Sequence, residues 1–284
     1  KKLQKRKAKP VSIQFENIEG YRNYNFSIPN TRNNGISALL RVKNEGDKIA
    51  DVLRSIYDVF DQVVIVNNAS TDDTHEKVKE MIARFDQDRK VLYYFYPFEI
   101  ALLGEESSNT EEYSVHNLTY LSNFGLSQCE CSYIHKWDGD MFLREEIKGR
   151  YKEFLKVAVK SNKCWQISGQ TVYRSLSGDF FIDPQAIYFE VQIIPNDGSV
   201  YFRKKGIFES INYVGAEENT FEDVVFFEMK YCDREEFSHW GTRDFPTQRK
   251  KREWKVFNAV REGRWEDAGL ERISPEIIFG ATVN

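Results

Sequence analysis

The sequence predicts an α/β fold with a mostly parallel central sheet flanked by helices. Two short runs of largely aliphatic, β-branched residues, 36–42 and 62–66, are typical of strands buried on both faces. Each run is followed by a stretch in which apolar residues recur at helical spacing, and a third strand-like run at 91–96 completes the pattern. Strands that alternate with helices over short connections form a parallel sheet with right-handed crossovers.

Composition narrows the class of protein. The chain has 284 residues, of which 41% are hydrophobic and 14% aromatic, enough apolar material to bury a sizeable core. Its formal net charge of −4 gives no global positive field, so we expect no nucleic-acid partner. No apolar run is long enough to span a membrane, and no signal peptide opens the chain. The four cysteines lack zinc or disulfide-framework spacing, which favours a reducing, cytoplasmic compartment.

Residues 1–34 are interpreted as a basic arm and an irregular lead-in. Lysines and arginines crowd the first nine residues, a pattern typical of a solvated tail or linker. Contact with an anionic membrane surface, as a peripheral protein, is the alternative. We expect a short hairpin in the lead-in. Because the chain begins at Lys1 without an initiator methionine, it is interpreted as part of a larger multidomain chain.

The pattern of strands and helices begins at residue 35. The strand at 36–42 is broken by the polar residues that follow it. Apolar residues between Ile49 and Phe60 then lie on one helical face. The strand at 62–66 comes directly afterwards, so the connection is short enough for a parallel pair.

A second helix is predicted after the second strand. Ser70 and Asp73 are spaced as an N-terminal capping pair, and the helical face continues to Phe85. The third strand, 91–96, is stopped by Pro97.

The following segments continue the alternation. Residues 99–112 are polar and acidic, so a mobile loop is expected there. Residues 114–127 have the pattern of a helix, 131–138 that of a partly apolar strand, and 147–158 that of another amphipathic helix.

The strand that ends at Asp138 leads into Asp138-Gly139-Asp140. Ligands of open α/β sheets collect outside the carboxyl ends of the strands, so two carboxylates there face a crevice. Hard oxygen donors suit Mg²⁺ or Mn²⁺, often together with phosphate oxygens. The sequence therefore predicts a metal-bridged diphosphate site, with a simple tight turn as the alternative.

Four segments in a fixed order resemble the family 2-type glycosyltransferases, which have the GT-A fold. Any one of these segments alone is a weak signal, but their order is specific, and the match covers about the first half of the chain. The segments are Ser37–Glu45, Val63–Thr74, Asn123–Leu126 and Trp137–Asp140. The resemblance implies a Rossmann-like GT-A domain at 35–245, with a nucleotide-binding half at 35–143 and a smaller, mixed-strand acceptor half at 144–245.

The resemblance also implies roles for individual residues. It implies that Asp138 and Asp140 bind the Mn²⁺ or Mg²⁺ ion, with Asp140 as the direct ligand and Asp138 also facing the donor. A carboxylate usually follows the second strand, but this chain has Asn68 there, which is both donor and acceptor of hydrogen bonds. The residues expected to line the nucleotide sugar are Arg41, Lys43, Asn44, Glu45, Asn68 and Asp72.

The acceptor half is expected to supply the general base. Strands are predicted at 165–173 and 188–194, with a return strand from residue 200. Asp223 is the chosen base, because Glu222-Asp223 resembles the acidic pair that the family places before a helix, although a strand could follow instead. Glu209 is the alternative. His239 is a candidate further metal ligand, with a packed structural histidine as the bland interpretation.

Residues 246–284 are interpreted as a basic helical extension. Trp254, Phe257 and Val260 recur at helical spacing, so the helix is expected to dock by this face with its charges in water. A membrane-surface contact is the alternative.

The predicted function is metal-dependent, inverting transfer of a sugar from a nucleotide-diphosphate donor to a glycan or lipid-linked acceptor. A nucleotidyltransferase is an alternative, but no Gly-rich phosphate loop follows the first strand. A catalytically silent sugar-binding domain of a larger synthase is another, against which the intact carboxylate pair argues.

Overall fold

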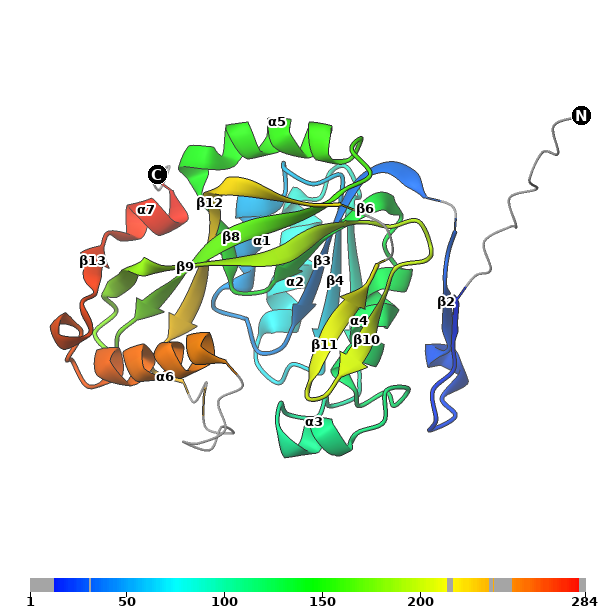
Figure 1. Ribbon diagram of the computed structural model, residues 1–284, viewed down its shortest axis with the longest axis horizontal. Coiled ribbons are helices and arrows are strands. Elements are labelled where there is room, and N and C mark those ends of the chain that lie inside the picture. The colour runs from blue at the N-terminus through cyan, green and yellow to red at the C-terminus, as the bar shows by residue number, and fades with distance from the viewer. Residues whose placement is uncertain (1–12, 31, 214–216, 235–236, 238–246, 281–284) are drawn as a thin grey trace, which may run out of the picture.

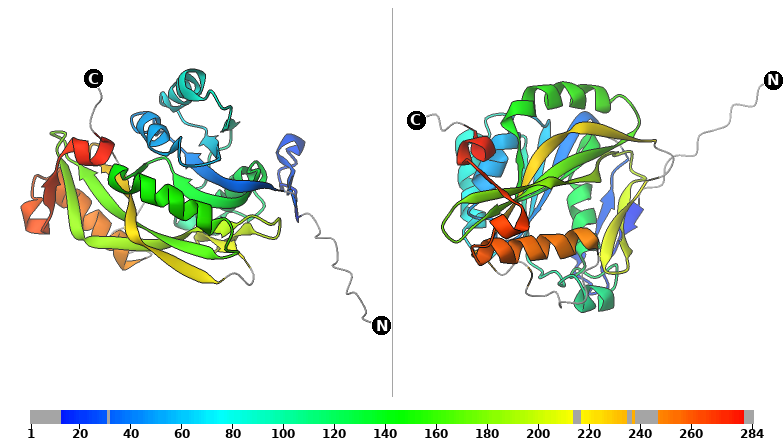
Figure 2. Two further views of the ribbon diagram at one scale, coloured as in Figure 1. Left: turned by 90° about the horizontal axis from the view of Figure 1, so that it is seen from above. Right: turned by 60° about the vertical axis from the view of Figure 1, so that its left-hand side comes forward.

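The prediction of an α/β fold is confirmed by the computed structural model, which describes residues 13–30, 32–213, 217–234, 237 and 247–280 (Figure 1). Within these residues, nine strands form one mixed sheet in the order β5-β4-β3-β6-β9-β8-β12-β7, with β13 paired to β9. Helices lie against both faces of the sheet (Figure 2). This is the architecture that the GT-A resemblance implies.

The first half of the sheet is parallel, as predicted. Its strands are β3 (Asn33–Val42), β4 (Gln62–Asn68), β5 (Val91–Tyr96) and β6 (Cys131–Asp138). In the register of β3, Arg41 lies between Val66 of β4 and Asp138 of β6. The polar residues that end these strands therefore meet at one edge of the sheet.

The second half of the sheet is mixed. It contains β7 (Met141–Leu143), β8 (Cys164–Arg174), β9 (Phe180–Pro195) and β12 (Glu218–Tyr231). Strand β9 is antiparallel to both β6 and β8, while β12 is parallel to β8. The strand direction reverses from β6 to β9 and again from β9 to β8, so β8 and β12 run parallel to β6. Strand β12 therefore ends at the same edge of the sheet as β6.

The two halves of the sheet meet at a short seam. Strand β6 pairs with β9 through Tyr133, Ile134 and His135 only, whereas its pairing with β3 continues to Asp138. The last three residues of β6 thus have a strand neighbour on one side, and the sheet opens at that point.

Two helical layers cover the sheet. Helices α1 (Ile49–Ile56), α2 (Thr74–Phe85) and α5 (Lys148–Ala158) pack on one face. Helix α4 (Leu118–Ser127) and the hairpin β1–β2 (Ile13–Phe15 and Phe26–Ile28) pack on the other. Short 3-10 turns at Arg22–Tyr24 and Glu145–Ile147 connect the elements. The short hairpin expected in the lead-in is thus present.

A separate two-stranded hairpin lies beside α4. It consists of β10 (Tyr201–Lys205) and β11 (Phe208–Asn212), so the predicted return strand pairs with β11 and not with β9. The segment expected to be a loop contains the short helix α3 (Glu105–Asn109). Ser107 of α3 donates a hydrogen bond to the carbonyl of Ile207, and Lys204 donates to the carbonyl of Ser108, which ties α3 to the hairpin.

The C-terminal segment packs against the second half of the sheet (Figure 1). It contains α6 (Gln248–Arg261), a 3-10 turn (Glu266–Ala268), β13 (Glu271–Ile273) and α7 (Pro275–Phe279). Val256, Phe257 and Val260 form a cluster with Tyr173 and Phe181, so α6 docks by the face predicted from its spacing. None of the described helices is long and apolar enough to cross a membrane.

One local prediction is wrong. Ser70 does not cap α2, because its hydroxyl accepts a hydrogen bond from the Asn44 backbone N–H instead. The N-cap residue is Asp73, whose side chain makes no capping bond. The spacing suited a capping pair, but the contact between two loops that are distant in sequence takes precedence.

Candidate active site

A cleft of about 610 Å³ opens where the sheet divides. Arg41 at the end of β3 and Asp138 at the end of β6 lie side by side in it, with Arg41 Nη2 at 3.3 Å from Asp138 Oδ1. Glu209 and Phe208 reach it from β11, and Thr247 and Arg249 from the start of α6. Segments from both halves of the chain therefore build one cavity.

Arg41 holds two carboxylates at once. Besides Asp138 it is ion-paired with Glu209, and the Ser122 hydroxyl of α4 lies 2.7 Å from Arg41 and 2.6 Å from Glu209. Lys136 is 4.0 Å from Glu209 on the same face of β6 as Asp138. Burial alone would raise the pKa of Asp138, but the charges of Lys136 and Arg41 outweigh it and the pKa is lowered. Asp138 is therefore held ionised.

Gly139 allows the turn after β6 to lie close to β3. A Cβ atom at this position would lie 2.8 Å from Val42 and 3.0 Å from Glu45, which are too close for a side chain. The turn is anchored on its other side by the backbone N–H of Met229, which donates to the carbonyl of Asp140 at 2.9 Å. Asp140 is thereby fixed against β12.

Asp140 is buried and ion-paired. Its Oδ2 is 2.9 Å from the ammonium of Lys230, which is also 2.9 Å from Oε1 of Glu228. Burial holds the pKa of Asp140 above its ordinary value, although Lys230 opposes this. Burial acts the same way on Glu228, but Lys230, Lys250 and other cations outweigh it, so the pKa of Glu228 is lowered.

Glu45 lies on the other side of Gly139. Its carboxylate is 2.7 Å from the ammonium of the buried Lys48. Burial, with the nearby charge of Asp140, nevertheless raises the pKa of Glu45 to about 7. The acids around the turn therefore differ in how readily they ionise.

The loops after β3 and β4 are joined by hydrogen bonds. Asn44 accepts from the N–H of Thr71 at 2.8 Å, and Asp72 accepts from the N–H of Gly46 at 2.9 Å. Asn44 and Ala69 both have positive φ, 55° and 44°, a conformation that L-residues other than Asn rarely adopt. Two of the predicted nucleotide residues, Asn44 and Asp72, thus hold the loops in place.

Asn67 and Asn68 have different surroundings. Asn67 is fully buried, donates to the Tyr93 hydroxyl and accepts from the N–H of Ser70, as a turn residue would. Asn68 is 7% exposed, and within the described residues its side-chain oxygen has no hydrogen-bond partner. An orphaned buried acceptor at a strand end is uncommon, so Asn68 is the better candidate for a ligand contact.

The remaining predicted residues lie in various places. Asp223 is on β12, so of the two continuations left open after Glu222-Asp223 the strand is the one that forms, and Val224 to Phe227 continue it. Its carboxylate pairs with Arg150 of α5 and does not line the cleft of Arg41 and Asp138. Lys43 is 38% exposed at 3.9 Å from Glu99. His239 lies outside the described residues.

Sequence reasoning missed several residues of the cleft. Lys136, Glu228 and Lys230 are charged residues inside otherwise apolar strands, and such positions are costly unless the charges are paired. That pattern in 226–231 was a usable signal for Glu228 and Lys230. No signal in the sequence pointed to Ser122, because a serine on a helix is common.

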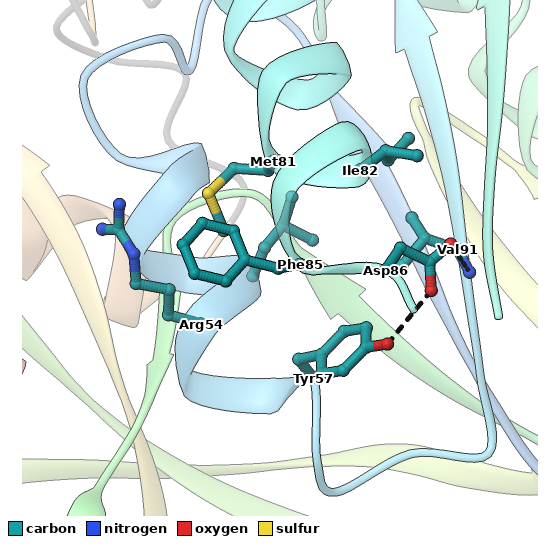
Figure 3. Close-up of a pocket in the computed structure, with 8 residues that line it drawn as sticks. Arg54, Tyr57, Met81, Ile82, Phe85, Asp86 and Val91 are labelled. Carbon is teal, nitrogen blue, oxygen red and sulfur yellow. Dashed lines mark hydrogen bonds between the residues drawn. The ribbon is translucent and has the colours of Figure 1, made fainter. Parts of the chain in front are cut away.

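A second, smaller hollow of about 150 Å³ lies between α1 and α2 (Figure 3). Its walls are mostly apolar, with Leu53, Met81 and Phe85, and the Tyr57 hydroxyl donates to Asp86 at 3.2 Å. It sits where β5 begins, at the opposite edge of the sheet from the carboxylates. The chemistry of the site therefore belongs to the larger cleft.

Comparison with known proteins gives one family match. The model of the family described as β-1,4-N-acetylgalactosaminyltransferase (CgtA) matches residues 8–193, well over half of the chain. No curated protein matches the sequence.

Several solved structures are similar at low identity. Residues 1–349 of TarS from S. aureus are 14% identical with a TM-score of 0.40; the match covers 68% of this chain and 60% of that one. Glucosyl-3-phosphoglycerate synthase from Mycobacterium tuberculosis, in complex with Mn²⁺, UDP and glucosyl-3-phosphoglycerate, is 14% identical with a TM-score of 0.33. That match covers 50% of this chain and 44% of the other.

Proposed function

The chain belongs to the β-1,4-N-acetylgalactosaminyltransferase (CgtA) family and is a glycosyltransferase; from this premise we propose that it transfers N-acetylgalactosamine from a nucleotide-diphosphate donor to a glycan acceptor. The family match supports the choice of sugar. The observation that carries the proposed transfer chemistry is the pair of carboxylates after β6, where Asp138 lines the cleft and Asp140 is ion-paired with Lys230. The nucleotidyltransferase and silent-domain alternatives are not favoured by this family membership.

The two carboxylates suit a divalent ion. Carboxylate oxygens are the ligands that Mn²⁺ and Mg²⁺ prefer. Within the described residues no group of three or more His, Cys, Asp or Glu side chains is placed to hold a metal alone. That agrees with an ion that shares its coordination with substrate phosphates, since Mg²⁺ is usually bound by one or two carboxylates and the phosphates themselves. When bound, the ion would neutralise the charge that develops on the leaving diphosphate.

The loops after β3 and β4 are proposed to hold the nucleotide. Asn68 has a buried side-chain oxygen without a partner, which would accept a hydrogen bond from a donor group on the base. Lys43 keeps an exposed ammonium at the end of β3 that suits a phosphate group. Arg41 is committed to Asp138 and Glu209, so we assign it the role of holding these carboxylates in position.

The general base is proposed to be Glu209. Inverting transfer needs a carboxylate within hydrogen-bond reach of the acceptor hydroxyl. Glu209 lines the same cleft as Asp138 and is oriented by Ser122, whereas Asp223 is paired with Arg150 outside the cleft. Exposed rings of Phe189 and Phe208 also line the cleft, and they offer apolar faces for the acceptor sugar.

The test uses Asp140→Asn with UDP-N-acetylgalactosamine as donor. Asparagine keeps an oxygen for Lys230 but loses the charge, so the fold should be retained. Donor hydrolysis with Mn²⁺ should fall by at least about 100-fold, since charge stabilisation by such an ion provides several kcal/mol. Asp58→Asn, which removes a surface acid paired with Lys152, should keep wild-type activity. Undiminished hydrolysis in Asp140→Asn, or in wild type with excess chelator, would contradict the proposed metal site.

A further inference from the structure

Lys230 stands at the place where a cation is expected. Its ammonium is 2.9 Å from Asp140 Oδ2 and 2.9 Å from Glu228 Oε1, and all three side chains are at most 12% exposed. An ammonium this close to a carboxylate forms a charge-assisted hydrogen bond. The carboxylate proposed as the direct metal ligand therefore already has a positive partner.

The charges around the turn are close to balanced without any ion. Asp140, Glu228 and Glu45 are opposed by Lys230 and Lys48, which pair with them at 2.7–2.9 Å. Buried charges require such pairing, because an uncompensated one is expensive in a low-dielectric interior. A divalent ion added to this arrangement would leave an excess of positive charge unless one ammonium moved.

The backbone around Lys230 is held in place, so the movement would involve its side chain alone. Met229 ties β12 to the carbonyl of Asp140, and β12 pairs with both β7 and β8 at this level. The lysine has a flexible four-carbon stem, and its ammonium is also 2.9 Å from Glu228 Oε1, a partner that it can keep when it leaves Asp140. When the ammonium leaves Asp140, the lysine charge therefore still has a carboxylate partner.

We propose that Lys230 is a built-in competitor for the divalent ion at Asp140. Its ammonium neutralises Asp140 in the donor-free enzyme, and it must leave that carboxylate before an ion can bind there. Lys230 therefore lowers the metal affinity of the free enzyme and makes tight metal binding depend on the donor diphosphate. This inference rests on the proposed metal site at Asp140 and adds to it a residue that regulates occupancy.

The experiment titrates Mn²⁺ into the donor-free full chain and counts free Mn²⁺ by electron paramagnetic resonance. The key variant is Lys230→Met with Glu228→Gln, because it removes one positive and one negative charge and leaves the net charge unchanged. It should bind Mn²⁺ at least about tenfold more tightly than wild type, since a charge-assisted hydrogen bond no longer has to be broken. Lys230→Met alone should show the same direction if it folds, which thermal unfolding reports.

Two controls separate this inference from the proposed function. Lys152→Met removes a surface lysine that pairs with Asp58, and it should bind Mn²⁺ as wild type does. In a second titration with UDP present, Asp140→Asn should lose the tight Mn²⁺ site that wild type forms. If Asp140→Asn loses the site but the double variant binds no more tightly than wild type, the competitor role is overturned while the metal site stands. If Asp140→Asn binds Mn²⁺ normally, both are overturned.

Discussion

At the scale of single residues, the site depends on which cation each carboxylate faces. Asp138 has Arg41 and Lys136 beside it and a lowered pKa, so it is ionised near neutral pH. Glu45, with its pKa raised to about 7, is not uniformly ionised near neutral pH. Acids on two loops that meet at Gly139 therefore differ in charge, and such divergence is typical of catalytic sites.

The assignment of the general base can be tested with two matched variants. Glu209→Gln should lower turnover by about 10²–10⁴-fold, the usual contribution of a general base, with donor affinity retained. Asp223→Asn should keep wild-type turnover, because that carboxylate faces Arg150. The measurements are steady-state transfer rates and donor affinity by calorimetry. If the two variants behave in the reverse way, Asp223 is the base after all; a loss of donor affinity in Glu209→Gln would show that it acts only through Arg41.

His135 gives a prediction about pH and stability. It is fully buried, with Nε2 at 2.6 Å from the Tyr151 hydroxyl, and burial lowers its pKa to about 3. Above the unfolded pKa of about 6.5 its contribution to stability is complete; below it, the unfolded chain takes up a proton that the folded chain refuses. The free energy of unfolding should fall by about 2 kcal/mol between pH 7.5 and 5 from this residue alone.

Denaturant unfolding at several pH values measures this effect. The double variant His135→Phe, Tyr151→Phe removes the imidazole together with its partner, so its stability should change less over that pH range. His116→Gln, which alters an exposed histidine, is the control and should follow wild type. Parallel curves for wild type and the double variant would show that His135 does not take part.

The proximity of Asp138 and Arg41 could be predicted from the order of the strands, while the roles assigned to them stay predictions. Asp138 and Arg41 end adjacent parallel strands, and a parallel sheet brings such ends together. The charges of Glu228 and Lys230 in an apolar strand indicate that these residues are paired. Their partners could not be predicted, because the contacts depend on two reversals of strand direction that no local pattern encodes. The pairing of Asp223 with Arg150 is likewise a tertiary contact between a strand and a helix distant in sequence.

At the scale of elements, the β10–β11 hairpin carries Glu209 to the cleft. Asn123 of α4 holds it, donating to the carbonyl of Phe202 at 2.8 Å and accepting from its N–H at 2.7 Å. These two bonds satisfy the N–H and C=O of Phe202 as the hydrogen bonds of a neighbouring strand would. They give a physical reason for an asparagine in the segment 123–126, which the family resemblance singled out.

Asn123→Ala should therefore loosen the hairpin. It leaves the N–H and C=O of Phe202 without their partner in a buried place, at a cost of about 1–3 kcal/mol for each group that water cannot reach. Amide hydrogen exchange at β10 should become faster than in wild type, and transfer should slow because Glu209 moves with β11. Asn258→Ala breaks a side-chain bond within α6 and should leave exchange at β10 unchanged. Unaltered exchange in Asn123→Ala would mean that other contacts hold the hairpin.

The elements of the first half were predictable and those of the second half only partly. Strand β4 is short, β-branched and fully buried, and residues 36–40 of β3 are mostly apolar and buried, so the local preference of both strands agrees with their burial. Strand β9 is 16 residues long and crosses an irregularity beside β8, and its solvent-exposed middle hides the periodicity. Strand β12 begins with acids that suit a helix start, and only pairing with β8 settles it as a strand.

At the scale of the whole molecule, the C-terminal helix belongs to the cleft. Arg249 of α6 lies over the Tyr188 ring, 3.3 Å from its centroid, and pairs with Glu190 and Glu228 at 2.7 and 2.8 Å. The sequence pattern predicted that the charges of this helix lie in water, but the charge of Arg249 is paired with carboxylates. Through it, α6 is joined to β9 and β12 at once.

Arg249→Met should lower the free energy of unfolding by about 2–3 kcal/mol. Glu228 is buried and loses a partner, but Arg249 is itself 30% exposed, so the effect falls below that of a fully buried pair. Arg84→Met removes an exposed ion pair on α2 and should change stability by less than about 0.5 kcal/mol. Urea unfolding of both variants makes the comparison; equal small losses would mean that α6 is held by its apolar face alone.

The short seam between β6 and β9 has a consequence for protein engineering. Among the described strands, β3 to β6 share ladder bonds with the rest of the sheet through three residue pairs only. These pairs join Tyr133, Ile134 and His135 of β6 to β9. Ladder bonds are made by the backbone and place little demand on side-chain identity. Chimaeras that exchange the chain from β8 onward between homologous enzymes therefore have few ladder bonds to match. They must also keep the side-chain contacts that cross the seam, among them Trp137 with Phe226, Arg41 with Glu209 and Asp140 with Lys230. The place where the sheet divides is therefore the junction at which to exchange the half that we propose binds the acceptor.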